Sequence, residues 1–242
     1  MSELAIEVRD LKLSYVSRQS YSIKNRLFQF KKSERKEIEA LRGVSFDAVK
    51  GEVLGVVGKN GSGKSTLLQT LAGVFEPDAG SIDLKGNGIS LLSLGTGFQN
   101  ELTGRENILL NGLLLGFTRA QLRDKTDEII AFSELEQFID MPIYTYSSGM
   151  NSKLAFSISA ILETDILLVD EVLSVGDANF RKKSYDKMRR LIEDKDRTAL
   201  IVSHQETTLR DLCDRVLWLD RGLIREIGET DAVLTDYLEY MK

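Results

Sequence analysis

The stretch GVVGKNGSGKSTLL, residues 55–68, decides the fold of this chain. It contains the pattern G-x-x-x-x-G-K-[ST], whose defining residues are Gly58, Gly63, Lys64 and Ser65. An apolar strand is predicted over residues 53–57, before the pattern, and a helix is predicted to begin near Lys64. Glycines allow successive backbone N–H groups to face phosphate oxygens. This context favours a phosphate-binding loop over a glycine-rich turn that arose by chance.

The side chains of this loop indicate its ligand more closely. Lys64 is placed to reach the β- and γ-phosphate oxygens of a nucleotide, and the Ser65 hydroxyl can bind Mg²⁺. We therefore expect a nucleotide and a magnesium ion here. The residues expected at the nucleotide are Gly58, Asn60, Gly61, Ser62, Gly63, Lys64, Ser65 and Thr66.

Two acidic residues end the apolar stretch ILLVDE, residues 166–171. We expect Asp170 to hold Mg²⁺, and Glu171 to orient or deprotonate the attacking water. Taken alone, a strand that ends in two acids is equally consistent with a solvated strand end. The nearby phosphate loop favours the functional interpretation.

The single histidine, His204, lies in LIVSHQE at the end of the next predicted strand. A lone histidine is more often a surface or hydrogen-bonded residue than a catalytic one. Parallel strands beside a phosphate loop, however, send their carboxyl ends to the same crevice. We therefore expect His204 to contact the γ-phosphate.

Alternating strands and helices predict an α/β fold with a largely parallel sheet. Helical periodicity dominates from Asn100 to Leu162. The turn at residues 220–223 predicts a hairpin, and a final helix is expected to begin at Thr230 or Asp231. Strands are expected at 4–15, 44–48, 52–58, 165–170, 198–203 and 216–220, and further helices at 180–194 and 205–214.

Composition excludes several classes of protein. The chain has 242 residues, one Cys and two Pro, which rules out a disulfide framework and zinc-like Cys/His spacing and favours a reducing cytoplasm. No apolar stretch approaches the roughly 20 residues that span a bilayer. The net charge of −5 argues against duplex nucleic acid as the main ligand. Residues 17–37 are an exception, because they carry a charge of +5.

The stretch TYSSGMNSKLAFS, residues 145–157, predicts a helix start with unsatisfied backbone N–H groups. Such a start attracts anions, although an ordinary helix cap is the simpler interpretation. No Lys or Arg lies within YSSGM to supply a positive charge.

These motifs resemble, in order and spacing, those of the ATP-binding-cassette ATPases. The resemblance rests on the phosphate loop, Gln99 in GTGFQNELTGREN, YSSGM at Tyr146–Met150, ILLVDE, SVGD at residues 174–177 and SH at residues 203–204. It covers almost the whole chain. It implies a RecA-like parallel-sheet core, an N-terminal antiparallel β subdomain and an α-helical subdomain. The implied division is one nucleotide-binding domain, with residues 1–98 and 163–242 as core and β subdomain and 99–162 as the helical subdomain.

The resemblance also assigns roles to individual residues. YSSGM binds the γ-phosphate of an ATP held by a second copy, so that two ATP molecules lie within a homodimer. Its Ser-Ser-Gly departs from the common Ser-Gly-Gly, so Ser147 can share a contact expected of Ser148 and Gly149. Tyr15 resembles the aromatic residue that stacks on adenine, with a core aromatic as the alternative. Gln99 would touch Mg²⁺ or the lytic water, and Asp177 would couple the two sites.

The segments at residues 94–112 and 144–157 are similar to those of polysaccharide exporters, which move lipid-linked O antigen, capsule or teichoic acid polymers. This similarity implies a separate transmembrane subunit, in two copies, and a peripheral position on the cytoplasmic face of the cytoplasmic membrane. The basic insertion 17–37 is expected either to meet an anionic lipid surface or to be a solvated loop. Because the chain ends at Lys242, we expect no appended carbohydrate-binding domain. The alternatives are the ATPase of a small-solute importer and, less strongly, a cassette that works outside transport in DNA repair or translation.

Overall fold

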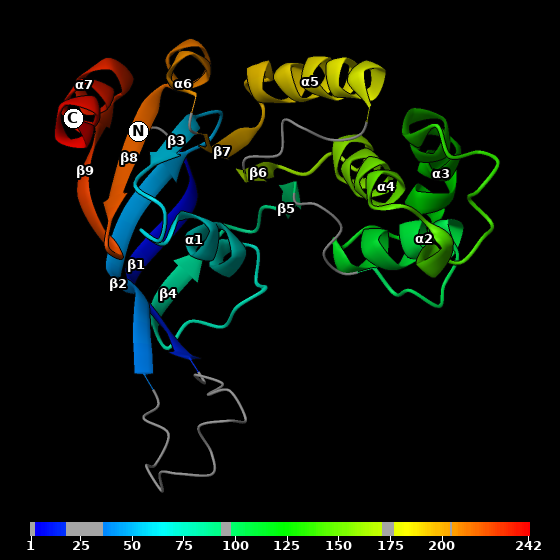
Figure 1. Ribbon diagram of the computed structural model, residues 1–242, viewed down its shortest axis with the longest axis horizontal. Helices are drawn as coiled ribbons and strands as arrows, with labels where there is room; N and C mark the ends of the chain where they lie inside the picture. The colour runs from blue at the N-terminus through cyan, green and yellow to red at the C-terminus, as the bar shows by residue number, and fades with distance from the viewer. Residues whose placement is uncertain (1–2, 18–35, 93–97, 171–176, 204) are drawn as a thin grey trace, which may run out of the picture.

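A computed structural model describes residues 3–17, 36–92, 98–170, 177–203 and 205–242 of the chain. Its centre is a six-stranded sheet in the order β5-β6-β7-β3-β8-β9 (Figure 1). Every neighbouring pair is parallel except β8 and β9. The strands are β3 (Val53–Val57), β5 (Ile89–Leu92), β6 (Ile166–Asp170), β7 (Thr198–Val202), β8 (Arg215–Asp220) and β9 (Leu223–Glu229).

Helices cover both faces of this sheet, and the alternation of side chains along each strand assigns every apolar residue to a face. Leu54 and Val56 of β3 belong to one apolar cluster, together with leucines of α1 (Lys64–Leu71). Val53 and Val57 belong to the other, to which α4 (Ser148–Ile161), α5 (Ala178–Glu193), α6 (Glu206–Leu212) and α7 (Thr230–Met241) contribute side chains. Because both faces are covered, these strands are apolar throughout.

A second sheet of three antiparallel strands packs on the α1 side, in the order β2-β1-β4. Its strands are β1 (Leu4–Ser17), β2 (Lys36–Val49) and β4 (Ala79–Asp83). The expected N-terminal antiparallel β subdomain is thereby confirmed. The ends of β1 and β2 flank most of the basic insertion, whose residues 18–35 lie outside the described part of the chain.

The remaining helices form a lobe of their own, seen on the right of Figure 1. They are α2 (Gly104–Leu114), α3 (Arg119–Ser133), the short 3₁₀ helix η2 (Ile143–Thr145) and α4 (Ser148–Ile161). Capping boxes begin α2 at Thr103 and α3 at Thr118. A separate apolar cluster, which includes Ile108, Leu122 and Leu154, holds the lobe together.

The predicted α/β fold is confirmed, and most elements lie where the pattern placed them. Strands β4 and β5 were not predicted. β4 is largely exposed, and only four residues form β5, so neither produces a clear periodic signal. The hairpin of β8 and β9 was predicted, as was a final helix that begins at Thr230. None of the helices among the described residues is long and apolar enough to cross a membrane.

Candidate functional site

The phosphate loop joins the end of β3, in the middle of the sheet, to the start of α1 (Figure 1). Two of its glycines have backbone angles that other residues rarely adopt, with φ of 154° at Gly58 and 107° at Gly63. A Cβ on Gly58 would lie 2.2 Å from the carbonyl oxygen of Leu219, and one on Gly63 would lie 2.5 Å from that of Ala40. Only glycine fits at these positions, so the loop backbone stays close to its neighbours.

The loop presents donors suited to an anion. Gly63 precedes α1 without a side-chain cap, so the first amides of this helix are not satisfied by a capping side chain. The ammonium group of Lys64 donates to the carbonyl oxygens of Gly58 at 2.7 Å and Lys59 at 3.2 Å. The buried Ser62 hydroxyl has no hydrogen-bond partner among the described residues. This arrangement fits the phosphate groups of a nucleotide.

A hydroxyl and a carboxylate meet beside the loop. Ser65 Oγ donates to Asp170 Oδ1 at 3.3 Å, although the two residues are 105 positions apart. Asp170 ends β6, which is separated from β3 by β7. Both oxygens are of the type that Mg²⁺ prefers. The described residues contain no cluster of three or more His, Cys, Asp or Glu, so an ion held by this pair would need phosphate oxygens and water to complete its shell.

Tyr15, near the end of β1, lies over α1. Its hydroxyl donates to Thr66 Oγ1 at 3.3 Å, and its ring meets Phe75 edge to face at 5.6 Å. Tyr15 is half-buried and packs on the core, as the simpler interpretation required. Adenine stacking by this ring stays a prediction. Asn60 and Gly61 lie exposed in the loop.

Gln99 lies exposed just before α2, and its backbone is held by a residue that the sequence did not single out. Asn107 Oδ1 accepts from the Gln99 N–H at 2.8 Å, and Asn107 Nδ2 donates to the Gln99 carbonyl at 3.0 Å. The same Nδ2 also contacts the carbonyls of Leu102 and Thr103. Asn107 is fully buried. A polar residue on the buried face of α2 was the signal that could have revealed it.

The YSSGM motif forms the start of α4 in the helical lobe, whereas the phosphate loop lies in the core (Figure 1). Ser147 caps the helix, because its hydroxyl accepts from the Met150 N–H at 3.2 Å. Ser148 begins the helix and is exposed, and Gly149 is half-buried. No hydrogen bond or ion pair among the described residues joins this motif to the chain's own phosphate loop.

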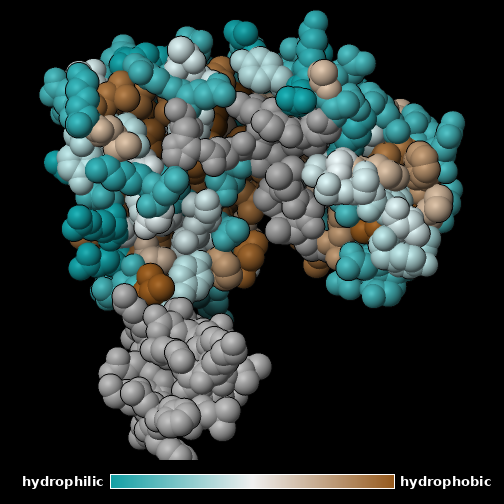
Figure 2. All heavy atoms as spheres, in the orientation of Figure 1, coloured by the Kyte–Doolittle hydropathy of each residue, from teal (hydrophilic) through white to brown (hydrophobic). Residues whose placement is uncertain are grey.

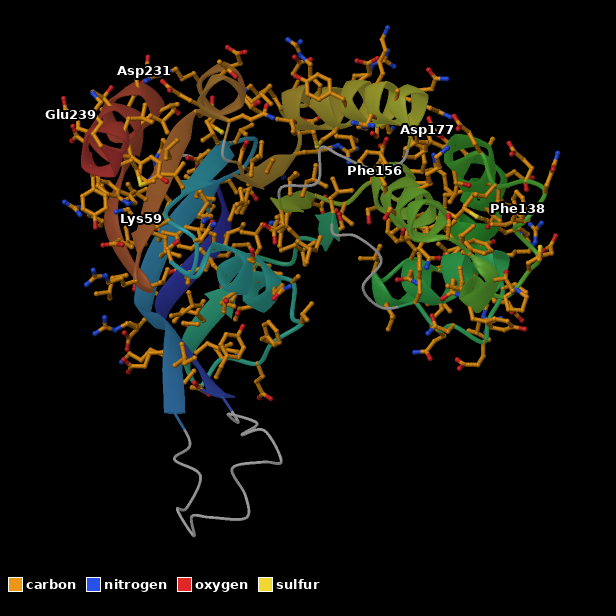
Figure 3. The ribbon with its side chains drawn as sticks, in the orientation of Figure 1. Lys59, Phe138, Phe156, Asp177, Asp231 and Glu239 are labelled. Carbon is orange, nitrogen blue, oxygen red and sulfur yellow. The ribbon has the colours of Figure 1, made fainter. Side chains whose placement is uncertain are left out.

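Asp177 has partners within its own chain. Its carboxylate caps α5 by accepting from the N–H groups of Asn179 at 3.1 Å and Phe180 at 3.0 Å, and it forms an ion pair with Lys153 at 2.7 Å. The bond to Lys153, followed by the backbone bonds, lowers the pKa of Asp177 to about 2. Figure 3 shows Asp177 between α5 and the helical lobe. Its predicted role across a dimer stays a prediction.

Two predicted catalytic residues, Glu171 and His204, lie outside the described residues. Their neighbours Asp170 and Ser203 end or follow the adjacent parallel strands β6 and β7. Asp170 pairs in register with Val202. The two strand ends therefore lie side by side at the edge of the sheet where the phosphate loop begins.

A parallel sheet with this loop after β3 and the Asp170 carboxylate at the end of β6 defines a phosphate-loop protein. Residues 41–174 match the ABC transporter family. The chain belongs to that family, as its motifs had indicated.

Similar proteins include several export subunits. The chain is 46% identical over 202 residues to the O-antigen export system ATP-binding protein RfbB of Klebsiella pneumoniae, covering 84% of this chain and 82% of that one. It is 46% identical over 202 residues to RfbB of Myxococcus xanthus, covering 84% of this chain and 46% of that protein. It is 43% identical to the teichoic acids export protein TagH of Lactococcus lactis, covering 86% of this chain and 44% of that protein. The chain thus spans about half the length of the latter two relatives.

Solved structures share the fold. A dimeric ATP-binding cassette bound to ADP and phosphate superposes with a TM-score of 0.70 at 19% identity, covering 93% of this chain and 98% of that one. The ATP-binding subunit of an ABC transporter gives a TM-score of 0.71 at 21% identity, covering 96% and 93%. The fold class is therefore that of the ABC ATPases.

Proposed function

We propose that this protein is the ATP-hydrolysing subunit that powers export of a lipid-linked polysaccharide, such as O antigen, teichoic acid or capsule, across the cytoplasmic membrane. It would act on the cytoplasmic face with a separate transmembrane subunit. The contact between Ser65 and Asp170 beside the phosphate loop carries the proposal of ATP hydrolysis. Identity of 43–46% to export subunits supports the choice of transport process and polymer.

The side chains divide the chemistry among them. ATP with Mg²⁺, when bound, supplies the phosphoryl group that is transferred to water. The loop amides and Lys64 would hold phosphate oxygens, with the Lys64 ammonium turning from the Gly58 and Lys59 carbonyls towards them. Ser65, Asp170 and Gln99 would hold the metal. Glu171 would orient or deprotonate the attacking water, and His204 would contact the γ-phosphate.

A second copy of the chain is proposed to complete the site. The helix start at the exposed Ser148 and the half-buried Gly149 lies in the other lobe from the phosphate loop of its own chain. In a two-fold symmetric dimer each helix start can face the partner's loop, so that two nucleotides lie between two chains. Asp177, which lies beside the helical lobe, would link the two sites.

An apolar groove between the core and the helical lobe is the proposed contact with the transmembrane subunit. Its volume is about 360 Å³, and its lining includes Ile89 and Leu91 from the core side and Phe98 and Leu114 from the helical side. Leu114 is 72% exposed, and Val74, at the same groove, is 55% exposed. Figure 2 shows the indentation between the two lobes. An apolar segment of the membrane subunit would cover these side chains, and movement of the lobe would pass to it.

Release of phosphate from ATP tests the catalytic part. Lys64→Ala and Asp170→Asn should each lower the rate by at least about 100-fold, because each removes a charge from the phosphate or metal site. Lys182→Ala is the matched control, since Lys182 is exposed on α5, far along the chain from the loop. Equal rates for Lys64→Ala and Lys182→Ala would contradict the assignment.

Capture from native membranes tests the transport part. Tagged Glu171→Gln protein, which should retain ATP, is purified with ATP and Mg²⁺, and the bound proteins and glycans are identified by mass spectrometry. A membrane subunit with a lipid-linked polymer supports polysaccharide export. A membrane subunit with a solute-binding protein would indicate the importer alternative, and recovery without a membrane protein would indicate a cassette outside transport.

A further inference from the structure

A stack of aromatic rings and cations joins the last helix, α7, to the phosphate loop. Lys59 Nζ, in the loop, lies 4.3 Å from the centre of the Tyr240 ring. Burial raises the pKa of Tyr237, one turn earlier on α7, and an interaction with the backbone of Gly58 opposes this shift. Side chains of one helix therefore lie beside two consecutive loop residues.

The other side of the stack is fixed to the sheet. Tyr240 lies 5.1 Å and Tyr237 5.5 Å from the ring of Trp218, which is 2% exposed in β8. The Arg225 guanidinium, on β9, lies 4.3 Å from the Trp218 ring and 4.2 Å from the Tyr240 ring. Trp218 also pairs in register with Val57, the residue before the loop. The rings of α7 therefore have a rigid support directly beside the phosphate loop.

The loop residues in this stack contact the lysine proposed to bind phosphate. The carbonyl oxygens of Gly58 and Lys59 both accept from Lys64 Nζ. The backbone at these two residues therefore sets where the Lys64 ammonium lies. We infer that α7 positions the phosphate loop for nucleotide binding, with Lys59 and Tyr240 as positioning residues. This inference rests on the proposed function, because the ligand of the loop is taken to be a nucleotide.

The Tyr240 ring can be tested apart from the fold. Tyr240→Ala should weaken MgADP binding, measured by calorimetry, by about two- to fivefold, the range expected from one exposed cation–π contact. Tyr240→Phe keeps the ring and should bind as the wild type does. Glu239→Ala is the matched control, because Glu239 is exposed on the same helix and lies at its outer side in Figure 3, whereas Lys59 lies beneath the helix. In hydrolysis assays the KM for ATP should rise by the same factor while kcat stays within about twofold.

A double-mutant cycle tests whether Lys59 and Tyr240 act through the same contact. Lys59→Met should also weaken MgADP binding, and adding Tyr240→Ala should cause little further loss, because the contact is already broken. Additive losses, or a Tyr240→Ala variant that binds like Glu239→Ala, would overturn the inference. A wild-type protein that binds no MgADP would instead overturn the proposed nucleotide site. Melting temperatures of all variants show whether a loss of binding merely follows a loss of fold.

Discussion

Lys153 Nζ lies 2.7 Å from Asp177 Oδ2, so that an ion pair joins α4, the helix that begins within YSSGM, to the cap of α5. Lys153 also contacts Glu134 at 3.1 Å and lies 5.0 Å from the centre of the Phe180 ring. Its side chain is only 14% exposed. Lys153 therefore ties α4 at one point to the end of α3 and to the start of α5, and it is one of the contacts between the helical lobe and the core.

Replacement of Lys153 tests this connection. Lys153→Met keeps much of the aliphatic chain but removes the charge, and it should lower the rate of ATP hydrolysis by about two- to thirtyfold, the range found when residues between coupled sites are changed. Lys153→Arg should retain most of the rate. Lys125→Met is the control, because Lys125 pairs only with Glu128 within α3 among the described residues. A normal rate in Lys153→Met would contradict the coupling role.

The pH dependence of stability reports on Asp177. Because its pKa falls from 3.8 to about 2 on folding, Asp177 stabilises the fold above its ordinary pKa and loses this effect as the pH falls towards 2. Asp177→Asn keeps an equally good helix cap but removes the charge. Near neutral pH the variant should melt at a lower temperature than the wild type, and the difference should shrink from about pH 4 to about pH 2.

Thermal unfolding followed by circular dichroism at several pH values measures this difference. Asp186→Asn is the control, because Asp186 is exposed on the same helix and its side chain forms no hydrogen bond or ion pair with the described residues. If the melting temperature of Asp177→Asn stays below that of the wild type by the same amount across this pH range, the ion pair with Lys153 does not stabilise the fold.

The buried Asn107 side chain forms two hydrogen bonds with the backbone of Gln99, and its replacement tests their importance. Asn107→Ala leaves the N–H of Gln99 and the carbonyls of Leu102 and Thr103 without this partner, and it should lower the free energy of unfolding by about 2 kcal/mol. Hydrolysis should also slow, since Gln99 loses its support. Urea unfolding and phosphate release measure the two effects. Asn100 is exposed and follows Gln99 in the chain, so Asn100→Ala should change neither stability nor hydrolysis. An equal loss in Asn100→Ala would contradict a supporting role for Asn107.

The single cysteine gives a simple probe of the core. Burial raises the pKa of Cys213 to about 12, so almost none of the reactive thiolate is present at about pH 8. The folded protein should react with a thiol reagent only as fast as the core opens, and unfolding in urea should expose the thiol. An immediate reaction in native buffer would show that this part of the core is open.

Sequence spacing predicted the parts of the site that a single strand, loop and helix carry. Gly58 to Ser65 lie within one such unit, and Asp170 ends a second apolar strand, so local patterns were enough. Asn107 was missed, because its role is to bind the backbone of the loop at Gln99, and that contact arises only when the loop folds against α2. The Lys153 to Asp177 pair was missed for the same reason, since three-dimensional packing alone joins these residues.

The arrangement of the rings around Trp218 could not be predicted from the sequence, although burial could. Trp218 and Cys213 lie in or beside apolar stretches of the sequence, and both are buried. Apolar periodicity gives burial but not ring geometry. The approach of Arg225 and Tyr240 to Trp218 depends on the hairpin register and on how α7 returns across β8, neither of which a local pattern contains.

The register of β1 and β2 has a practical consequence for the segment between them. The two strands stay paired up to Ser17 and Lys36, beyond the position of Tyr15. A shift of one residue would turn the side chains of a strand to its opposite face, so this pairing maintains the contact of Tyr15 with Thr66. Any change made between these strands must therefore keep Ser17 opposite Lys36, because the position of Tyr15 against α1 depends on that register.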